Sequence, residues 1–135
     1  MARFTDPKKL EAHLQEAIED TIKNTVVKTQ DKLGDDAPVF TGMMQSSWFS
    51  SEGSPSRAVP TEGSKTARTD ARALNVKIGR DYYLSSNLDY SQRVCLTDDW
   101  PGRSAPKDWF RKIRDFDVSR LGDEAAREAK SKYGL

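Results

Sequence analysis

The most regular pattern in this chain lies in residues 7–33, PKKLEAHLQEAIEDTIKNTVVKTQDKL. Apolar side chains recur about every fourth position and form a row of Leu10, Leu14, Ile18, Ile22, Val26, Thr29 and Leu33, in which threonine is the one polar member. Ala17 widens this row. A helix has about 3.6 residues per turn, so this row winds slowly around the helix and crosses a partner at an angle. Thr5 or Asp6 can cap the first amides, Pro7 suits the first turn and Gly34 suits the end. The stretch predicts one long amphipathic helix over residues 6–33.

The region that follows, residues 39–96, predicts a small antiparallel sheet. Pro38 cannot continue the first helix, so a turn begins there. Residues 46–51 mix small polar and aromatic side chains in the manner of a strand. Residues 82–86 predict the next strand, and residues 91–96 a further extended stretch.

Between these strands the sequence supports two interpretations. Leu74, Val76 and Ile78 alternate with polar residues or glycine, which favours a strand. A short helix through Ala67, Ala71 and Leu74 is the alternative.

Residues 52–73 differ in composition from the rest of the chain and predict a long, flexible, basic loop. They are rich in glycine, serine and proline and contain almost no large apolar side chain. A loop of this length in a small domain is usually functional or disordered. The segment 52–80 carries a net charge of +3, and the neighbouring segment 81–102 carries −3.

The C-terminal region, residues 104–133, predicts a helical segment that packs on the sheet. Ser104 can cap its start, with an early proline and an acid in the first turn. Its first apolar face consists of Trp109, Phe110, Ile113 and Phe116. The pattern continues to Tyr133, either as one helix or after a break near Gly122. Together the elements predict an α+β fold in one domain over residues 1–135.

Composition and residue counts argue against most enzyme chemistry. The chain has 135 residues, a net charge of +1, one cysteine and one histidine. Zinc sites, Ser-His-Asp triads and Cys-His pairs all draw on histidine, so only a His13–Cys95 pair stays open. Asp98 and Asp99 could hold a divalent cation, although adjacent carboxylates in turns are usually caps or solvated charges. We expect no enzyme activity, no metal and no cofactor.

The N-terminus lacks the apolar core of a secretory signal, and no apolar run approaches the about 20 residues of a membrane span. We therefore expect a protein made in a cytoplasm and without membrane contact.

The segregated charges suggest contacts between copies or with other proteins. In a ring of head-to-tail copies the acidic edge of one subunit can meet the basic edge of the next. The candidate interface residues are Arg57, Lys65, Arg68 and Arg72 on the basic side and Asp98 and Asp99 on the acidic side. A small DNA-binding module is the rival from another class, because basic residues and tyrosines could bind phosphates and bases. A net charge near zero argues against that rival.

Three segments resemble the small neck or tail-completion proteins of tailed bacteriophages, which join head to tail. Residues 36–48, DAPVFTGMMQSSW, are similar to the family pattern P-V-D-T-G-x-x-x-x-x-W that follows a long amphipathic helix. Residues 83–90, YLSSNLDY, are similar to Y-I-S-N-N-L-P-Y, and residues 104–110, SAPKDWF, are similar to the Q-A-P-x-G-M-V that leads into the final helix. The positions that carry the match are Thr41, Gly42, Trp48, Asn87, Tyr90, Ala105 and Pro106.

The resemblance implies a non-enzymatic virion protein, synthesised in the cytoplasm of a bacterial host and located at the head–tail junction. It implies a homo-oligomeric ring, commonly of six copies, that caps the tail tube and docks to the connector and other neck proteins. Arg57, Arg68 and Arg72 would then face a partner or the genomic DNA that passes through the ring. A head-side adaptor or a stopper ring is the alternative within the same class.

Overall fold

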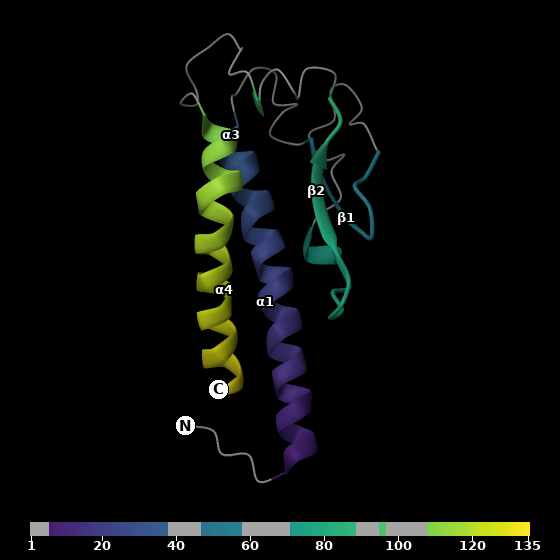
Figure 1. The fold of residues 1–135 in the computed structure, drawn as a ribbon, viewed down its shortest axis with the longest axis vertical. Coiled ribbons are helices and arrows are strands. Elements are labelled where there is room, and N and C mark those ends of the chain that lie inside the picture. Colours follow the sequence, from purple (N-terminus) through teal and green to yellow (C-terminus); the bar gives the residue numbers. More distant parts are fainter. Residues whose placement is uncertain (1–5, 38–46, 58–70, 89–94, 97–107) are drawn as a thin grey trace.

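Two long helices lie side by side and antiparallel, and a two-stranded sheet lies on the other side of the N-terminal helix (Figure 1). The computed structural model describes residues 6–37, 47–57, 71–88, 95–96 and 108–135. The fold is α+β, with a long N-terminal helix, an antiparallel sheet and a C-terminal helix that contacts the strands, as the sequence predicts.

The N-terminal helix α1 runs over Pro7–Asp36, three residues further than expected. The Asp6 carboxylate accepts a hydrogen bond of 3.0 Å from the Lys8 amide, which confirms the predicted cap. Gly34, the expected end, is buried inside the helix. The helix ends where Ala37 turns to extended backbone, because the residue before a proline avoids the helical region.

The sheet pairs β1, Trp48–Glu52, with β2, Tyr82–Ser86, in antiparallel register. Trp48 lies opposite Ser86, and Glu52 lies opposite Tyr82. Both strands were expected. At the end of β1 the chain turns back through Gly53, which has a positive φ and donates its amide to the Asp81 carbonyl over 2.8 Å.

The described ends of the predicted loop over residues 52–73 are ordered by contacts. Glu52 belongs to β1, and Ala71–Ala73 forms a short 3-10 helix, η1, whose Ala71 is fully buried. The strand favoured for residues 74–78 is wrong, because there the Lys77 amide donates to the Tyr82 hydroxyl rather than to a neighbouring strand. The alternative of a short helix is right for η1 alone; Ala67 lies outside the described residues.

The C-terminal helical region is one continuous helix from Trp109 to Tyr133, without a break at Gly122. It consists of α3, Trp109–Lys112, the π-helical turn η2, Ile113–Asp117, and α4, Val118–Tyr133. The predicted start at Ser104 lies outside the described residues. Gly122 faces α1, where a methyl group in its place would lie 3.8 Å from the Thr25 side chain.

An aromatic cluster joins the sheet to the C-terminal helix. The rings of Trp48 and Phe110 lie parallel, 5.9 Å apart, and Trp109 stands edge-on to both. Leu33 of α1 and Ile113 of η2 complete this buried cluster. At residues 95–96 the chain is helical rather than extended, which corrects the expected extended stretch there. Cys95 packs in the cluster, whereas His13 packs against the ring of Tyr133, so the structure does not bring this cysteine and histidine together.

Candidate assembly surfaces

Of the predicted interface residues, the structure describes Arg57 and Arg72. Arg57 is exposed at the end of a described segment. Arg72, on η1, is also exposed, but its guanidinium binds the Asp31 carboxylate of α1 at 2.7 Å. This ion pair connects η1 to α1 within the monomer. The other four, Lys65, Arg68, Asp98 and Asp99, lie outside the described residues.

Two of the positions that match the phage family lie in the described part, and both have structural roles there. Trp48 is buried in the aromatic cluster. Asn87, just after β2, donates its amide to the Ser56 carbonyl over 2.6 Å and so ties the segment after β1 to the end of β2. Thr41, Gly42, Tyr90, Ala105 and Pro106 lie outside the described residues.

A buried glutamine fixes the sheet side of the molecule against α1. Gln30 is fully buried, its amide nitrogen donates to the Trp48 carbonyl over 3.0 Å, and its oxygen accepts from the Ala71 amide over 2.9 Å. One side chain thereby satisfies a donor and an acceptor from two segments that are distant in sequence. Gln30 thereby connects both β1 and η1 to α1.

Charged contacts set the register of α1 against α4. Lys28 lies 3.1 Å from both Glu124 and Glu128, and the hydrogen bond to Glu124 raises the pKa of Lys28. Near the other end, Lys132 and the Tyr133 hydroxyl each donate to Asp20 over 2.8 Å. The Lys132 bond is the main reason that the pKa of Asp20 is lowered.

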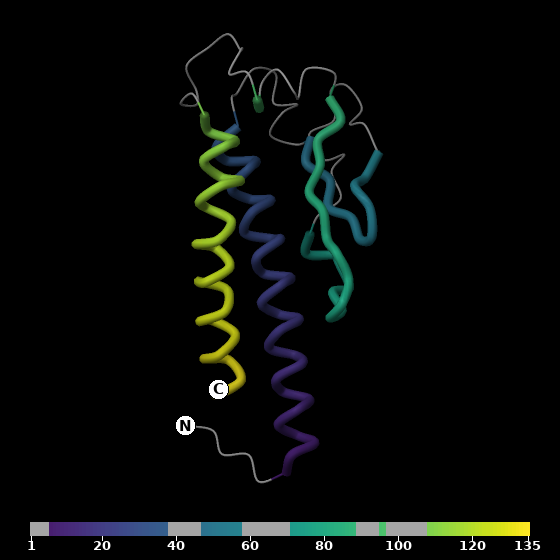
Figure 2. Tube along the Cα trace, viewed as in Figure 1, coloured from purple at the N-terminus to yellow at the C-terminus, as the bar shows by residue number. Residues whose placement is uncertain are grey.

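The end of α4 therefore lies beside the N-terminal half of α1, as the tube view also shows (Figure 2). These pairs lie at the surface, so each adds little to stability by itself.

The N-terminal half of α1 keeps part of its apolar row outside the core. Leu14 and Ile18 are 44% and 48% exposed, although the sequence pattern placed them on the buried face. The described part of the sheet contacts the C-terminal half of α1, where Thr29, Gln30 and Leu33 are buried. In the other half Ala17 is buried, whereas Leu14 and Ile18 stay accessible.

Phe116 is a further apolar side chain whose predicted burial is wrong. It is 71% exposed, although it was assigned to the apolar face of the C-terminal helix. The buried row consists of Trp109, Ile113, Asp117, Leu121, Ala125 and Ala129, each four residues from the next. Phe116 stands one position off that row, and the sequence does not reveal this because the buried position beside it is occupied by the charged Asp117.

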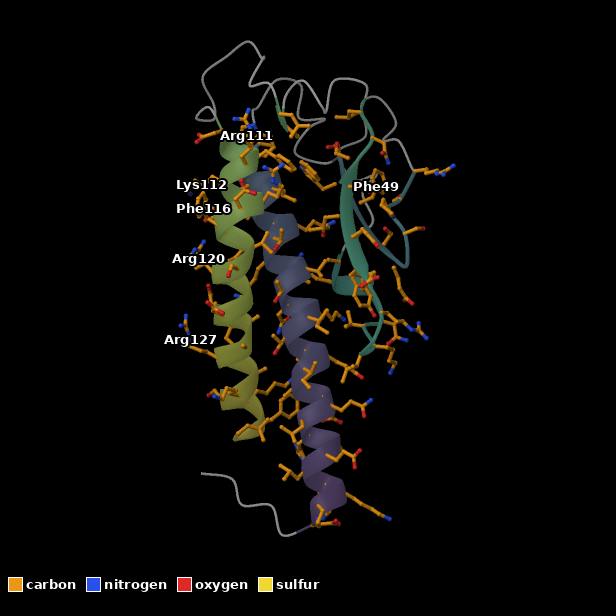
Figure 3. All side chains as sticks on the ribbon, viewed as in Figure 1. Phe49, Arg111, Lys112, Phe116, Arg120 and Arg127 are labelled. Carbon is orange, nitrogen blue, oxygen red and sulfur yellow. The ribbon has the colours of Figure 1, made fainter. Side chains whose placement is uncertain are left out.

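The surroundings of Phe116 are basic. Lys112 and Arg120 lie four residues to either side of it, and both extend to the buried carboxylate of Asp117, at 3.5 and 3.8 Å. Figure 3 shows that Lys112, Phe116, Arg120 and Arg127 project from the side of the C-terminal helix that faces away from α1. We call Lys112, Phe116 and Arg120 the Phe116 patch.

An open cavity of about 280 Å³ lies between β2 and the start of the C-terminal helix. Its walls are mainly apolar and include Trp48, Leu84, Cys95, Leu96 and Phe110. Burial raises the pKa of the Cys95 thiol to about 12. The cavity therefore presents a neutral thiol and apolar surface, which suits packing rather than nucleophilic chemistry.

Within the described segments, no group of three or more histidine, cysteine or acidic side chains is placed to hold a metal ion. The helices described there include none of the length and apolar character needed to cross a membrane. Comparisons with protein-family models, curated proteins and solved structures gave no match to this chain.

Proposed function

We propose that this chain is a structural virion protein of a tailed bacteriophage, a neck or tail-completion (tail terminator) protein that forms a ring of about six copies at the head–tail junction. Its partners are further copies of itself and the neighbouring neck, connector and tail-tube proteins, and genomic DNA passes close by. The resemblance of residues 36–48, 83–90 and 104–110 to that family first suggests this role.

One observation carries the proposal furthest: the monomer exposes apolar side chains on two separate helical surfaces. Leu14 and Ile18 are exposed on α1, and Phe116 is exposed on the C-terminal helix. Single exposed apolar residues are ordinary, but an exposed aromatic flanked by basic residues is typical of interfaces. A ring subunit needs two such surfaces, one for each neighbour.

The first experiment is light scattering on a size-exclusion column over a concentration series, with negative-stain microscopy of the same peak. The proposal predicts closed rings with one subunit number and a central hole. Open filaments, or dimers that do not grow with concentration, would contradict it.

A second experiment tests the role in the particle. In a phage that encodes this chain, disabling its gene should leave filled heads and tails that lack their terminating ring, and the two should not join. Normal yields of joined, infectious particles from the disabled phage would refute the proposal. A head-side adaptor or stopper is distinguished by which half, head or tail, retains the protein in wild-type lysates separated into free heads and free tails.

The Phe116 patch also keeps a DNA-binding module as the second candidate. Basic side chains beside an exposed aromatic can bind phosphate and stack on a base. This candidate predicts an affinity for bare duplex that falls steeply with salt and depends on Lys112 and Arg120. A titration that shows no binding at low salt would remove it.

A further inference from the structure

The Phe116 patch is built on a local irregularity of the helix. The five residues of η2 form a π-helical turn, which admits one residue more than an α-helical turn, and such turns occur often at functional sites. Phe116 projects from this turn with 71% of its surface exposed. The segment from Arg111 to Arg120 contains four basic residues and two acids. The patch is thus an aromatic side chain in a positive surrounding.

The exposed row on α1 has the opposite charge. From Leu10 to Ile22 the chain contains four acids and no lysine or arginine, but Asp20 is paired with Lys132 of α4. Glu16 lies two residues from both Leu14 and Ile18 and therefore on another side of the helix. Glu11 lies three residues before Leu14 and seven before Ile18, so it shares their side of the helix. We call Leu14, Ile18 and Glu11 the α1 row. It is an aliphatic surface with one carboxylate beside it.

A single copy cannot bring these two surfaces together. Asp20 pairs with Lys132 and Tyr133, whereas Leu33 packs in the same cluster as Ile113, so α1 and the C-terminal helix run antiparallel. Phe116 lies near the Leu33 end of this pair, and Ile18 lies near the Tyr133 end. Fifteen residues of helix separate Ile18 from Leu33, which corresponds to about 22 Å.

Charge also decides against two other surfaces of a second copy as the partner of the Phe116 patch. A cavity of about 190 Å³ between α1, β2 and η2 is apolar and could receive Phe116. Arg114 forms part of its wall, however, and would repel Lys112 and Arg120 beside Phe116. Contact of one Phe116 patch with a second Phe116 patch would oppose like charges. The α1 row offers apolar area together with the complementary charge.

We propose that the Phe116 patch of one copy packs on the α1 row of the next copy, with Phe116 between Leu14 and Ile18 and the flanking basic residues near Glu11. This inference rests on the proposed ring function and names the contact that would build it. The contact joins two different surfaces, so it is head-to-tail and leaves one free surface of each kind on every pair.

The test uses the full chain and two complementary variants. Phe116→Gln removes the aromatic side chain, and Leu14→Gln with Ile18→Gln removes the row; glutamine keeps helix propensity in both. Ile78→Gln is the matched control, because Ile78 is 46% exposed and belongs to neither surface. All these positions are exposed, so the variants should fold and their urea midpoints should stay close to that of the wild type.

Sedimentation velocity over a concentration series measures the association. The wild type should associate, and more weakly as salt is raised. Each variant should raise the dissociation constant at least tenfold, and Ile78→Gln should leave it unchanged. An equimolar mixture of the two variants should form 1:1 dimers and nothing larger. In such a dimer the intact Phe116 patch of the Leu14→Gln, Ile18→Gln variant binds the intact α1 row of the Phe116→Gln variant, and the two remaining surfaces are both mutated.

Three results would overturn the inference: a wild type that stays monomeric up to about 1 mM, association that Phe116→Gln does not weaken, or a variant mixture that stays monomeric. Loss of duplex binding in Phe116→Gln with unchanged self-association would assign the patch to DNA and would also overturn the inference.

Rings that form equally well in Phe116→Gln would refute this contact and leave the ring function standing. Open filaments that need both surfaces would support the contact and refute the ring.

Discussion

Replacing Gln30 by methionine tests whether one buried amide holds the sheet side of the molecule to α1. Methionine has a similar length and is flexible, so it fills the space with little change in packing. What it removes is the donor to the Trp48 carbonyl and the acceptor for the Ala71 amide. Both of these backbone groups would then be buried without their partner.

The size of the effect follows from those two groups. Each buried polar group that loses its partner costs about 1–3 kcal/mol, and the added apolar burial of methionine offsets a part. We expect Gln30→Met to lower the free energy of unfolding by about 2–4 kcal/mol. That is a large share of the about 5–15 kcal/mol typical of a domain.

Urea unfolding followed by tryptophan fluorescence measures this loss, because Trp48 and Trp109 are both buried in the native state. With a denaturant slope of about 1–3 kcal/mol/M, the midpoint should fall by about 1–2 M. The matched control is Gln15→Met on the same helix, where the exposed side chain donates to Glu19 at the surface. Its midpoint should stay within the error of the wild type.

Gln30→Glu adds an internal check on the mechanism. The carboxylate keeps an acceptor for the Ala71 amide but loses the donor to the Trp48 carbonyl, and it places a charge in the interior. The protonated acid regains a donor, so this variant should recover stability relative to Gln30→Met as the pH falls from 7 to 4. A Gln30→Met variant as stable as Gln15→Met would refute the assigned role of the buried amide.

Three further predictions concern the backbone, the helix pair and the thiol. Gly122→Ala should stabilise the protein by about 0.5–1 kcal/mol, because alanine favours helix and the site has room for a methyl group. Gly79→Ala should destabilise it by about 1 kcal/mol, since Gly79 has a φ of +86°. Thermal melts of both variants check this, and a destabilised Gly122→Ala would contradict it. The hydrogen bond from Lys132 lowers the pKa of Asp20 in the folded state, so the stability that Asp20 adds is present above its unfolded pKa near 3.8 and is lost as the pH falls through the folded value. Urea midpoints should therefore differ between Asp20→Asn and the wild type at pH 6 and converge toward pH 2, and a difference that does not change with pH would show that the charge is not responsible. Burial raises the pKa of Cys95 from 9.0 to about 12, so alkylation by iodoacetamide at pH 8 should be about a thousandfold slower in the native protein than in urea, and equal rates would refute the burial of this thiol.

The ends of the elements could be predicted from sequence where local chemistry decides them. Asp6 and Pro7 start α1, and the second strand lies at residues 82–86 as the composition indicates. The helix end was misplaced at Gly34 because a glycine inside a helix is tolerated when packing requires it. Pro38, which acts on the backbone of Ala37, set the actual end.

The candidate surfaces could not be predicted in this way, because exposure depends on what lies opposite. Leu14 and Ile18 continue the same sequence pattern as Leu33, yet only Leu33 is buried. The pattern cannot tell how far along α1 the sheet reaches or which side of α1 the second helix covers. These are properties of segments distant in sequence.

Periodicity, caps and prolines act over a few residues, so they are enough to predict the α+β class, the two long helices and the two strands. Tertiary structure alone decided that Gln30 joins three segments and that α4 lies along one side of α1. It also decided that a π-helical turn leaves Phe116 outside the core. Such features depend on the packing of distant segments, which fixes burial and hydrogen-bond partners only when the chain is folded.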